Sequence, residues 1–179
     1  SEMCIRDSPG TTAEGLAKLR PAFVKDGTIT AASASQISDG AAAVVLTTRE
    51  NAETKGLEIL ATLGEYGQTA GPDTKLHSQP SQATAAALQK AGWEAGDLDF
   101  LEINEAFASV VAQSIKDLDY PLDKTNIHGG GISLGHPIGA SGARLVVHAA
   151  HELKRRGSGK AAVSLCGGGG QGDALLLWR

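Results

Sequence analysis

Three short loops of the sequence each contain one side chain that can take part in chemistry. Asn104 lies in "EINEAFAS", His136 in "GGGISLGHPIGASGAR" and Cys166 in "LCGGGGQG". A thiol acts as a general acid or base once its pKa is adjusted. An imidazole and a positioned water can stabilise an enolate oxygen, and an amide can donate hydrogen bonds. The three side chains together suit carbanion and acyl chemistry.

The glycines around these side chains leave backbone N–H groups uncovered. Those that follow Cys166 can face a negatively charged oxygen, as in an oxyanion hole. Pro137 fixes the backbone immediately after His136. Ser141 is predicted to cap the helix that follows, and free N–H groups at that helix start attract a phosphate or a thioester oxygen.

Each of the three side chains also has a simpler structural interpretation. Asn104 follows a predicted strand and can be the N-cap of the next helix, with Glu105 as a first-turn carboxylate. His136 can be a satisfied histidine in a structural turn. Cys166 can be an inert core residue, as most buried cysteines are.

Two nucleotide-binding motifs are excluded by their context. Gly167, Gly169 and Gly172 match G-x-G-x-x-G, but that fingerprint needs a helix after the loop, and residues 173–179 read as a strand. The segment "GHPIGASG" lacks the Gly-Lys-Ser/Thr ending of a phosphate-binding loop. A nucleotide-binding domain is therefore not expected.

The elements that must position these loops alternate along the chain. Thr12 and Thr48 are predicted to cap short helices, the second of which ends before Gly56. Continuous apolar runs and Gly or Pro boundaries predict the remaining elements. The expected strands are 26–35, 39–48 (a buried strand), 58–68, 98–103, 160–166 and 173–179, and the other helices are 80–91, 105–118 and 143–156. Interleaved strands and helices predict a layered α/β or α+β domain.

Bulk properties narrow the class of protein. The chain has 179 residues, 41 % of them hydrophobic, which suits one domain, or one domain and a piece of another. A net charge of −4 without a basic patch argues against nucleic acid as the partner. Two cysteines, Cys4 and Cys166, make no disulfide scaffold, and no apolar run is long enough for a membrane span. A cytoplasmic protein is expected, and residues 1–8 are interpreted as a non-native start.

The three motifs occur in an order and at distances that resemble the C-terminal signatures of thiolases, the acetyl-CoA acetyltransferases and 3-ketoacyl-CoA thiolases. They are "NEAFA" (104–108), residues 129–144 and "CGGGGQG" (166–172), and residues 16–46 also resemble the family. The resemblance implies an α/β fold whose C-terminal domain is a five-stranded mixed sheet covered by helices. It divides the chain into the end of a loop region (1–27), a returning strand segment of the N-terminal domain (28–48) and the C-terminal domain (49–179).

The resemblance also implies a role for each site residue. Cys166 would exchange the proton of the acetyl-CoA methyl group, and His136 would activate a nucleophilic cysteine of the N-terminal half. His136 and a water held by Asn104 would form one oxyanion hole, and the Gly168 N–H would help to form the other. Ser35 would lie near the pantetheine arm of coenzyme A, and Cys4 lies outside the nucleophile's motif.

The implied activity is Claisen condensation of two acetyl-CoA to acetoacetyl-CoA, or thiolysis of a 3-ketoacyl-CoA as in β-oxidation. An acyl-CoA is then the substrate, no cofactor or metal is expected, and the whole protein forms a dimer or tetramer. The chain alone is expected to be inactive. Residues 32–36 and 79–82 depart from the family pattern, which leaves chain-length preference open. The alternative is a non-catalytic acyl-CoA-binding or scaffold protein of thiolase fold.

Overall fold

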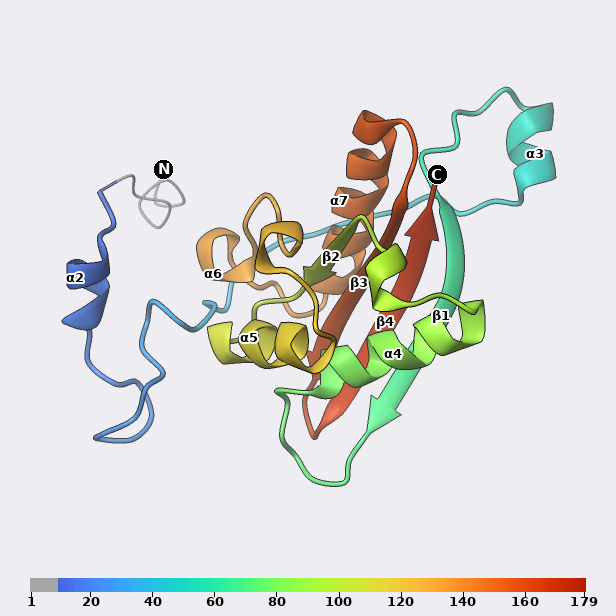
Figure 1. Ribbon diagram of the computed structural model, residues 1–179. Coiled ribbons are helices and arrows are strands. Elements are labelled where there is room, and N and C mark those ends of the chain that lie inside the picture. Colours follow the sequence, from blue (N-terminus) through green and yellow to red (C-terminus); the bar gives the residue numbers. More distant parts are fainter. Residues whose placement is uncertain (1–9) are drawn as a thin grey trace.

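A four-stranded mixed sheet forms the centre of the structure, a computed structural model that describes residues 10–179 (Figure 1). Its strands are β1 (Thr62–Ala70), β2 (Phe100–Ile103), β3 (Lys160–Gly167) and β4 (Gln171–Trp178), in the order β1-β4-β3-β2. β4 pairs antiparallel with β1 and β3, whereas β2 and β3 are parallel. The α/β class is confirmed.

The expected fifth strand is reduced to a single bridge in the part of the chain that the structure describes. Thr125 pairs with Leu101 beside β2. The next residue, Asn126, has a φ of 48°, which ends the extended geometry. Its side chain then takes over the pairing, since Oδ1 accepts from Ile103 N at 2.8 Å and Nδ2 donates to Ile103 O at 3.0 Å. The prediction of five strands is therefore wrong for residues 10–179.

Helices cover both faces of the sheet. α4 (Gln79–Ala91) and α5 (Ala108–Asp117) pack on one face, and α7 (Ser141–Arg156) packs on the other (Figure 1). Successive residues of a strand point to opposite faces, so β3 contributes Ala162 to the first core layer and Ala161 and Val163 to the second. The predicted helix 105–118 begins later, at Ala108.

Close approach between helix and sheet explains one glycine of β1. A Cβ at Gly67 would overlap the carbonyl oxygen of Ala83 in α4. The helix can therefore lie directly on the strand only because residue 67 has no side chain. Ala83 and Ala87, on the contacting side of α4, are both fully buried.

Shorter elements complete the chain. Thr12 and Thr48 accept hydrogen bonds from Gly15 N and Asn51 N, which confirms both predicted caps. The elements are α2 (Ala13–Ala17), α3 (Arg49–Thr54), α6 (Gly131–Leu134) and the 3₁₀ turns η1 (Ala95–Asp97) and η2 (Leu122–Lys124). No helix in the portion of the chain described is long and apolar enough to cross a membrane.

The two strands predicted before residue 49 do not form. Within 26–35 the structure has only isolated bridges, Thr30 with Pro21 and Ala34 with Phe107. The segment 39–48, expected to be a buried strand, has no regular structure, and Val45 is 91 % exposed. A strand is stable only when a neighbouring strand satisfies its backbone, and no strand among residues 10–179 lies beside this segment.

Candidate active site

Parallel pairing brings Asn104 and Cys166 to the same end of the sheet. β2 ends with Ile103 opposite Ser164, and Asn104 N donates to Ser164 O at 2.9 Å. This register places Asn104 beside Leu165, one residue before Cys166. Asn104 is completely buried and its backbone extends the ladder, so it is not the N-cap of α5, which is Phe107. The capping interpretation of Asn104 is wrong.

His136 is in direct contact with Asn104. The distance from Asn104 Nδ2 to His136 Nε2 is 3.3 Å. The backbone of His136 is held as well, because its N–H donates to Gln36 O at 3.0 Å. Two of the three side chains singled out in the sequence thus form one pair, at the end of β2 and beside β3, which carries Cys166 one residue before its end.

Ser141 does not cap α7, contrary to the prediction. The N-cap of this helix is Ala140, with no side-chain hydrogen bond. The Ser141 hydroxyl instead lies 2.6 Å from His136 Nδ1 and 3.0 Å from the carbonyl oxygen of Pro137. Ser141 is fully buried, and these are the two contacts that its hydroxyl makes with the described residues.

Glu105 organises the glycine-rich segment that leads to His136, a role that the sequence did not indicate. Its carboxylate accepts from Asn126 Nδ2 at 2.9 Å and from Ile132 N at 3.0 Å. A Cβ at Gly130 would lie 2.5 Å from Glu105 Cδ, and one at Gly131 would lie 3.5 Å from Asn104 Oδ1. Gly130 is therefore needed because the backbone passes directly over the Glu105 carboxylate, whereas a Cβ at Gly131 would make only an ordinary contact with Asn104.

Ser35 and Gly168 lie at the margins of this arrangement. Ser35 donates both its backbone N–H and its hydroxyl to Ala106 O, at 3.1 and 3.2 Å, which places it against the 104–108 loop. Gly168 lies in the exposed turn between β3 and β4, and a Cβ there would meet nothing within 4 Å. The backbone at Gly168 is therefore accessible to a ligand.

The surroundings shift the protonation of both reactive groups. Burial lowers the pKa of His136, and the Arg144 guanidinium of α7 lowers it further. Burial raises the pKa of the Cys166 thiol. Near neutral pH the imidazole is then uncharged and the thiol is protonated.

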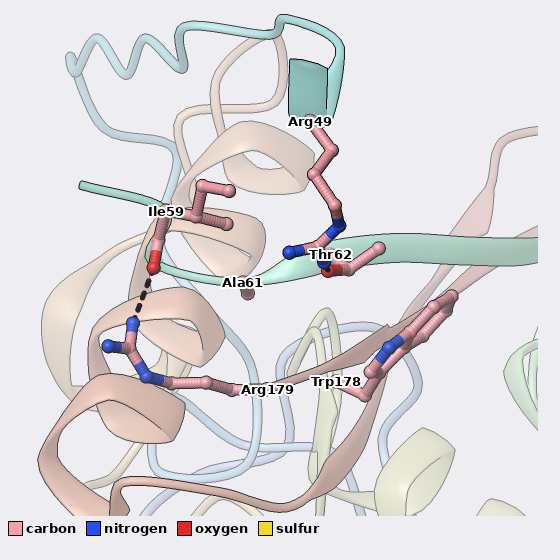
Figure 2. Close-up of a pocket in the computed structure, with 6 residues that line it drawn as sticks. All are labelled: Arg49, Ile59, Ala61, Thr62, Trp178 and Arg179. Carbon is pink, nitrogen blue, oxygen red and sulfur yellow. Dashed lines mark hydrogen bonds between the residues drawn. The ribbon is translucent and has the colours of Figure 1, made fainter. Parts of the chain in front are cut away.

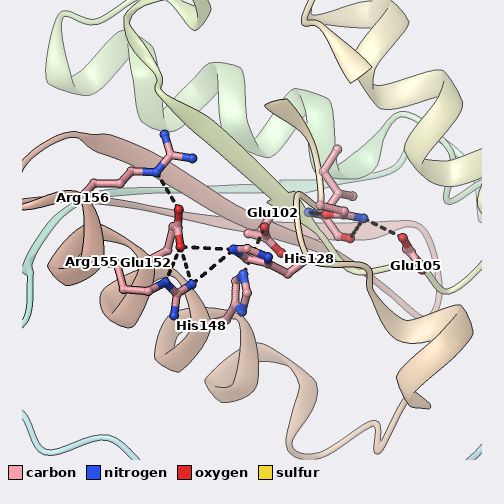
Figure 3. Close-up of polar contacts among 9 residues, drawn as sticks. Glu102, Glu105, His128, His148, Glu152, Arg155 and Arg156 are labelled. Carbon is pink, nitrogen blue, oxygen red and sulfur yellow. Dashed lines mark hydrogen bonds and ion pairs between the residues drawn. The ribbon is translucent and has the colours of Figure 1, made fainter. Parts of the chain in front are cut away.

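A second group of charges lies along α7 and reaches Glu102 of β2, two residues before Asn104 (Figure 3). His148 Nε2 is 3.5 Å from Glu102 Oε1, and the two histidine rings of His128 and His148 pack edge to face. Burial raises the pKa of Glu152, but hydrogen bonds from Arg156, Arg155 and His128 outweigh burial and set it at about 2. These contacts fix α7 and were not predicted.

A pocket of about 300 Å³ lies at the opposite end of the sheet and contains none of the predicted site residues (Figure 2). Trp178 lines it, and the register places Trp178 opposite Lys160, at the start of β3, whereas Cys166 is near its end. Arg179 closes the pocket by donating to Ile59 O. Over residues 10–179 no three His, Cys, Asp or Glu side chains gather as a metal site would require.

A mixed sheet between helical layers, with an amide, an imidazole and a thiol near the ends of two parallel strands, has the architecture and motifs of a thiolase C-terminal domain. Family models agree: "Thiolase, C-terminal domain" matches residues 57–179, and "Thiolase, N-terminal domain" matches residues 6–50. The chain belongs to the thiolase family.

Individual relatives support the same conclusion. The chain is 58 % identical to a "Probable acetyl-CoA acetyltransferase" of Mycolicibacterium smegmatis, over 94 % of this chain and 44 % of that protein. A human mitochondrial 3-ketoacyl-CoA thiolase in complex with CoA superposes with a TM-score of 0.91 at 42 % identity, covering 96 % and 44 % of the two chains. The dimeric peroxisomal thiolase of Saccharomyces cerevisiae superposes with a TM-score of 0.91 at 40 % identity, with the same coverage of the two chains. The chain thus spans less than half the length of these relatives.

Proposed function

We propose that the protein to which this chain belongs is a thiolase-type acyltransferase. It condenses two acetyl-CoA to acetoacetyl-CoA and CoA, or runs the reverse thiolysis of a 3-ketoacyl-CoA. The observation that carries the proposal is the direct Asn104–His136 contact beside β3, the strand that carries Cys166. A non-catalytic acyl-CoA-binding protein would have no need of this pair and a thiol together.

His136 is proposed as the base that activates the nucleophilic cysteine supplied by the N-terminal half. The lowered pKa of His136 supports this role, because only the uncharged imidazole can take the thiol proton. The nucleophile then carries the acyl group and CoA leaves with that proton. Cys166 is the only cysteine that the described part of the chain contains.

Cys166 is proposed to exchange a proton with the methyl carbon of the second acetyl-CoA. Its raised pKa keeps the thiol protonated near neutral pH. In thiolysis this thiol donates its proton to the departing carbanion. In condensation Cys166 first loses its proton to solvent, the thiolate takes the methyl proton, and the carbanion then attacks the acyl carbon while the nucleophile's sulfur leaves as a thiolate.

Asn104 is proposed to hold a water that stabilises the enolate oxygen together with His136. Its Oδ1 is buried and has no hydrogen-bond partner among the described residues. Buried polar atoms are nearly always paired with protein or ordered water, which supports a water at this position. The Gly168 N–H would contribute to the second oxyanion hole, and Ser35 would lie near the pantetheine arm.

The remaining features of the proposal follow from the family. The acyl-CoA thioester is the substrate, so no cofactor is required, and the protein acts in fatty-acid metabolism. The homologous yeast thiolase is dimeric, which supports a homo-oligomeric whole protein, a dimer or tetramer. A cytoplasmic location is part of this proposal, and so is the division into 1–27, 28–48 and 49–179.

The test uses a chimera in which residues 10–179 replace the matching segment of the Mycolicibacterium smegmatis relative. The chimera should cleave acetoacetyl-CoA with CoA, measured as loss of substrate absorbance. His136→Ala should lower turnover by roughly 100- to 1,000-fold, as expected when a donor and base is removed. A folded chimera that binds CoA without any turnover would favour the non-catalytic alternative.

A further inference from the structure

Both ring nitrogens of His136 have a partner, and the partner on the inner side is Ser141. Nδ1 lies 2.6 Å from the Ser141 hydroxyl, whereas Nε2 faces Asn104 at 3.3 Å. The first distance is at the short end of hydrogen bonds in proteins, and Ser141 is completely buried. The orientation of the imidazole is thus set by a hydroxyl that water does not reach.

The chemistry of a hydroxyl suits this position better than that of a carbonyl or a carboxylate. A hydroxyl both donates and accepts, so it stays bonded to His136 Nδ1 whether that nitrogen carries a proton or a lone pair. When Nδ1 is protonated, the Ser141 hydroxyl accepts a hydrogen bond from it and donates a hydrogen bond to Pro137 O, 3.0 Å away. When Nδ1 is unprotonated, Ser141 donates to it and Pro137 O keeps its two backbone donors, Ala140 and Ser141.

These two arrangements correspond to the two tasks that the proposed function gives His136. With the proton on Nδ1, Nε2 presents a lone pair and can act as a base. With Nδ1 accepting from Ser141, Nε2 carries the proton and can donate to an oxyanion. The opposite side chain adapts equally, because the Asn104 amide offers Nδ2 as a donor or Oδ1 as an acceptor after a flip of the amide.

We infer that Ser141 is a positioning residue that holds the His136 ring in place in both tautomers. The inference rests on the proposed function, because the two tasks of His136 come from it. No other described side chain is hydrogen-bonded to Nδ1. The segment that pairs with His136, residues 36–38, is uncharged, and Arg144 is the charged group that acts on the ring.

The test compares buried serines in the chimera. Ser141→Ala removes the hydroxyl, and Ser141→Cys keeps its approximate volume but forms only weak hydrogen bonds. Ser114→Ala is the matched control, because Ser114 is equally buried and donates to a backbone carbonyl, His77 O, at 3.1 Å, outside the site. Both Ser141 variants should lose roughly 10- to 100-fold in kcat with little change in KM, whereas the control should keep its kcat.

The pH profile separates a role in positioning from a role in folding. An acceptor at Nδ1 stabilises the imidazolium, so its loss should lower the pKa of His136 further. The acid limb of kcat/KM should then move to lower pH in both Ser141 variants and stay fixed in Ser114→Ala. An active parent chimera whose Ser141→Ala variant keeps its kcat and its acid limb would overturn this inference. An inactive parent chimera would instead count against the proposed function.

Discussion

Two asparagines at the end of β2 should respond to alanine in opposite ways. Asn104 has one side-chain contact, to His136, and its buried Oδ1 has no partner among residues 10–179. Asn126 has three side-chain hydrogen bonds, to Ile103 N, Ile103 O and Glu105 Oε1, at 2.8 to 3.0 Å. We predict that Asn104→Ala strongly lowers activity at little cost in stability, and that Asn126→Ala mainly destabilises the fold.

The magnitudes follow from these contacts. Removing Asn104 loses one hydrogen bond of about 1 kcal/mol to His136, and the water proposed at Oδ1 can stay or be replaced by another water, so no backbone group is left without a partner. The free energy of unfolding should therefore change by no more than about 1 kcal/mol. Asn126→Ala loses three bonds, leaves the Ile103 N–H and C=O unpaired and keeps a φ that alanine disfavours. It should cost about 2–4 kcal/mol, or roughly 5–15 °C in Tm.

The assay measures thiolysis of acetoacetyl-CoA and thermal unfolding of both variants in the chimera. Asn104→Ala should lose roughly 100- to 1,000-fold in kcat, as for one oxyanion-hole donor, at nearly unchanged Tm. Asn126→Ala should lose much less activity when assayed well below its Tm. If Asn104→Ala kept its kcat within about threefold of the parent, the proposed water site would be wrong. If Asn104→Ala lost more Tm than Asn126→Ala, the stability estimates based on these hydrogen bonds would be wrong.

Three further predictions test the thiol, the packing and the charge network. Cys166→Ser should cost about 2–4 kcal/mol of transition-state stabilisation in carbon–carbon bond formation or cleavage, while acylation of the N-terminal cysteine is less affected. Equal losses in separate assays of the two half-reactions would contradict the role assigned to Cys166. Gly67→Ala should lower the free energy of unfolding by about 1–3 kcal/mol in a urea titration, because its Cβ overlaps Ala83 O, and an unchanged midpoint would show that α4 can move away. The pKa of Glu152 is lowered from 4.5 to about 2, so its stabilisation is present above pH 4.5 and is lost as the pH falls towards 2. The Tm of Glu152→Gln should therefore fall less steeply over this range than that of the parent, and parallel curves would exclude the network as the cause.

Features that depend on neighbours in the chain were predictable from the sequence. The caps at Thr12 and Thr48 need only an oxygen close to an N–H three residues on, and α4 ends at Gly92 with a φ of 66°, which glycine adopts without strain. The helical spacing of apolar residues located α7, and the continuous apolar runs located β3 and β4. The three loop motifs also named the candidate site side chains.

Features that depend on distant partners were decided only by the tertiary structure. Asn104 looked like a helix cap, but its backbone continues β2, because its N–H donates to the carbonyl oxygen of Ser164, sixty residues further along the chain. Ser141 also looked like a cap; its partners, His136 and Pro137, are only five and four residues away, and the fold of that loop, not a distant partner, directs its hydroxyl to His136. Glu105 holds the glycine-rich segment by accepting from Ile132 N, a contact that depends on how that segment folds over it.

The segment 39–48 shows the same limit for strands. Its apolar run predicted a buried strand, yet Val45 and Leu46 are 91 % and 67 % exposed. A side-chain pattern reports which surface a residue can bury, but the backbone of a strand must also find a partner for its hydrogen bonds. The sequence by itself therefore determined the local elements and the reactive residue types, whereas hydrogen-bond partners distant in sequence decided which of them became structure and which came together as a site.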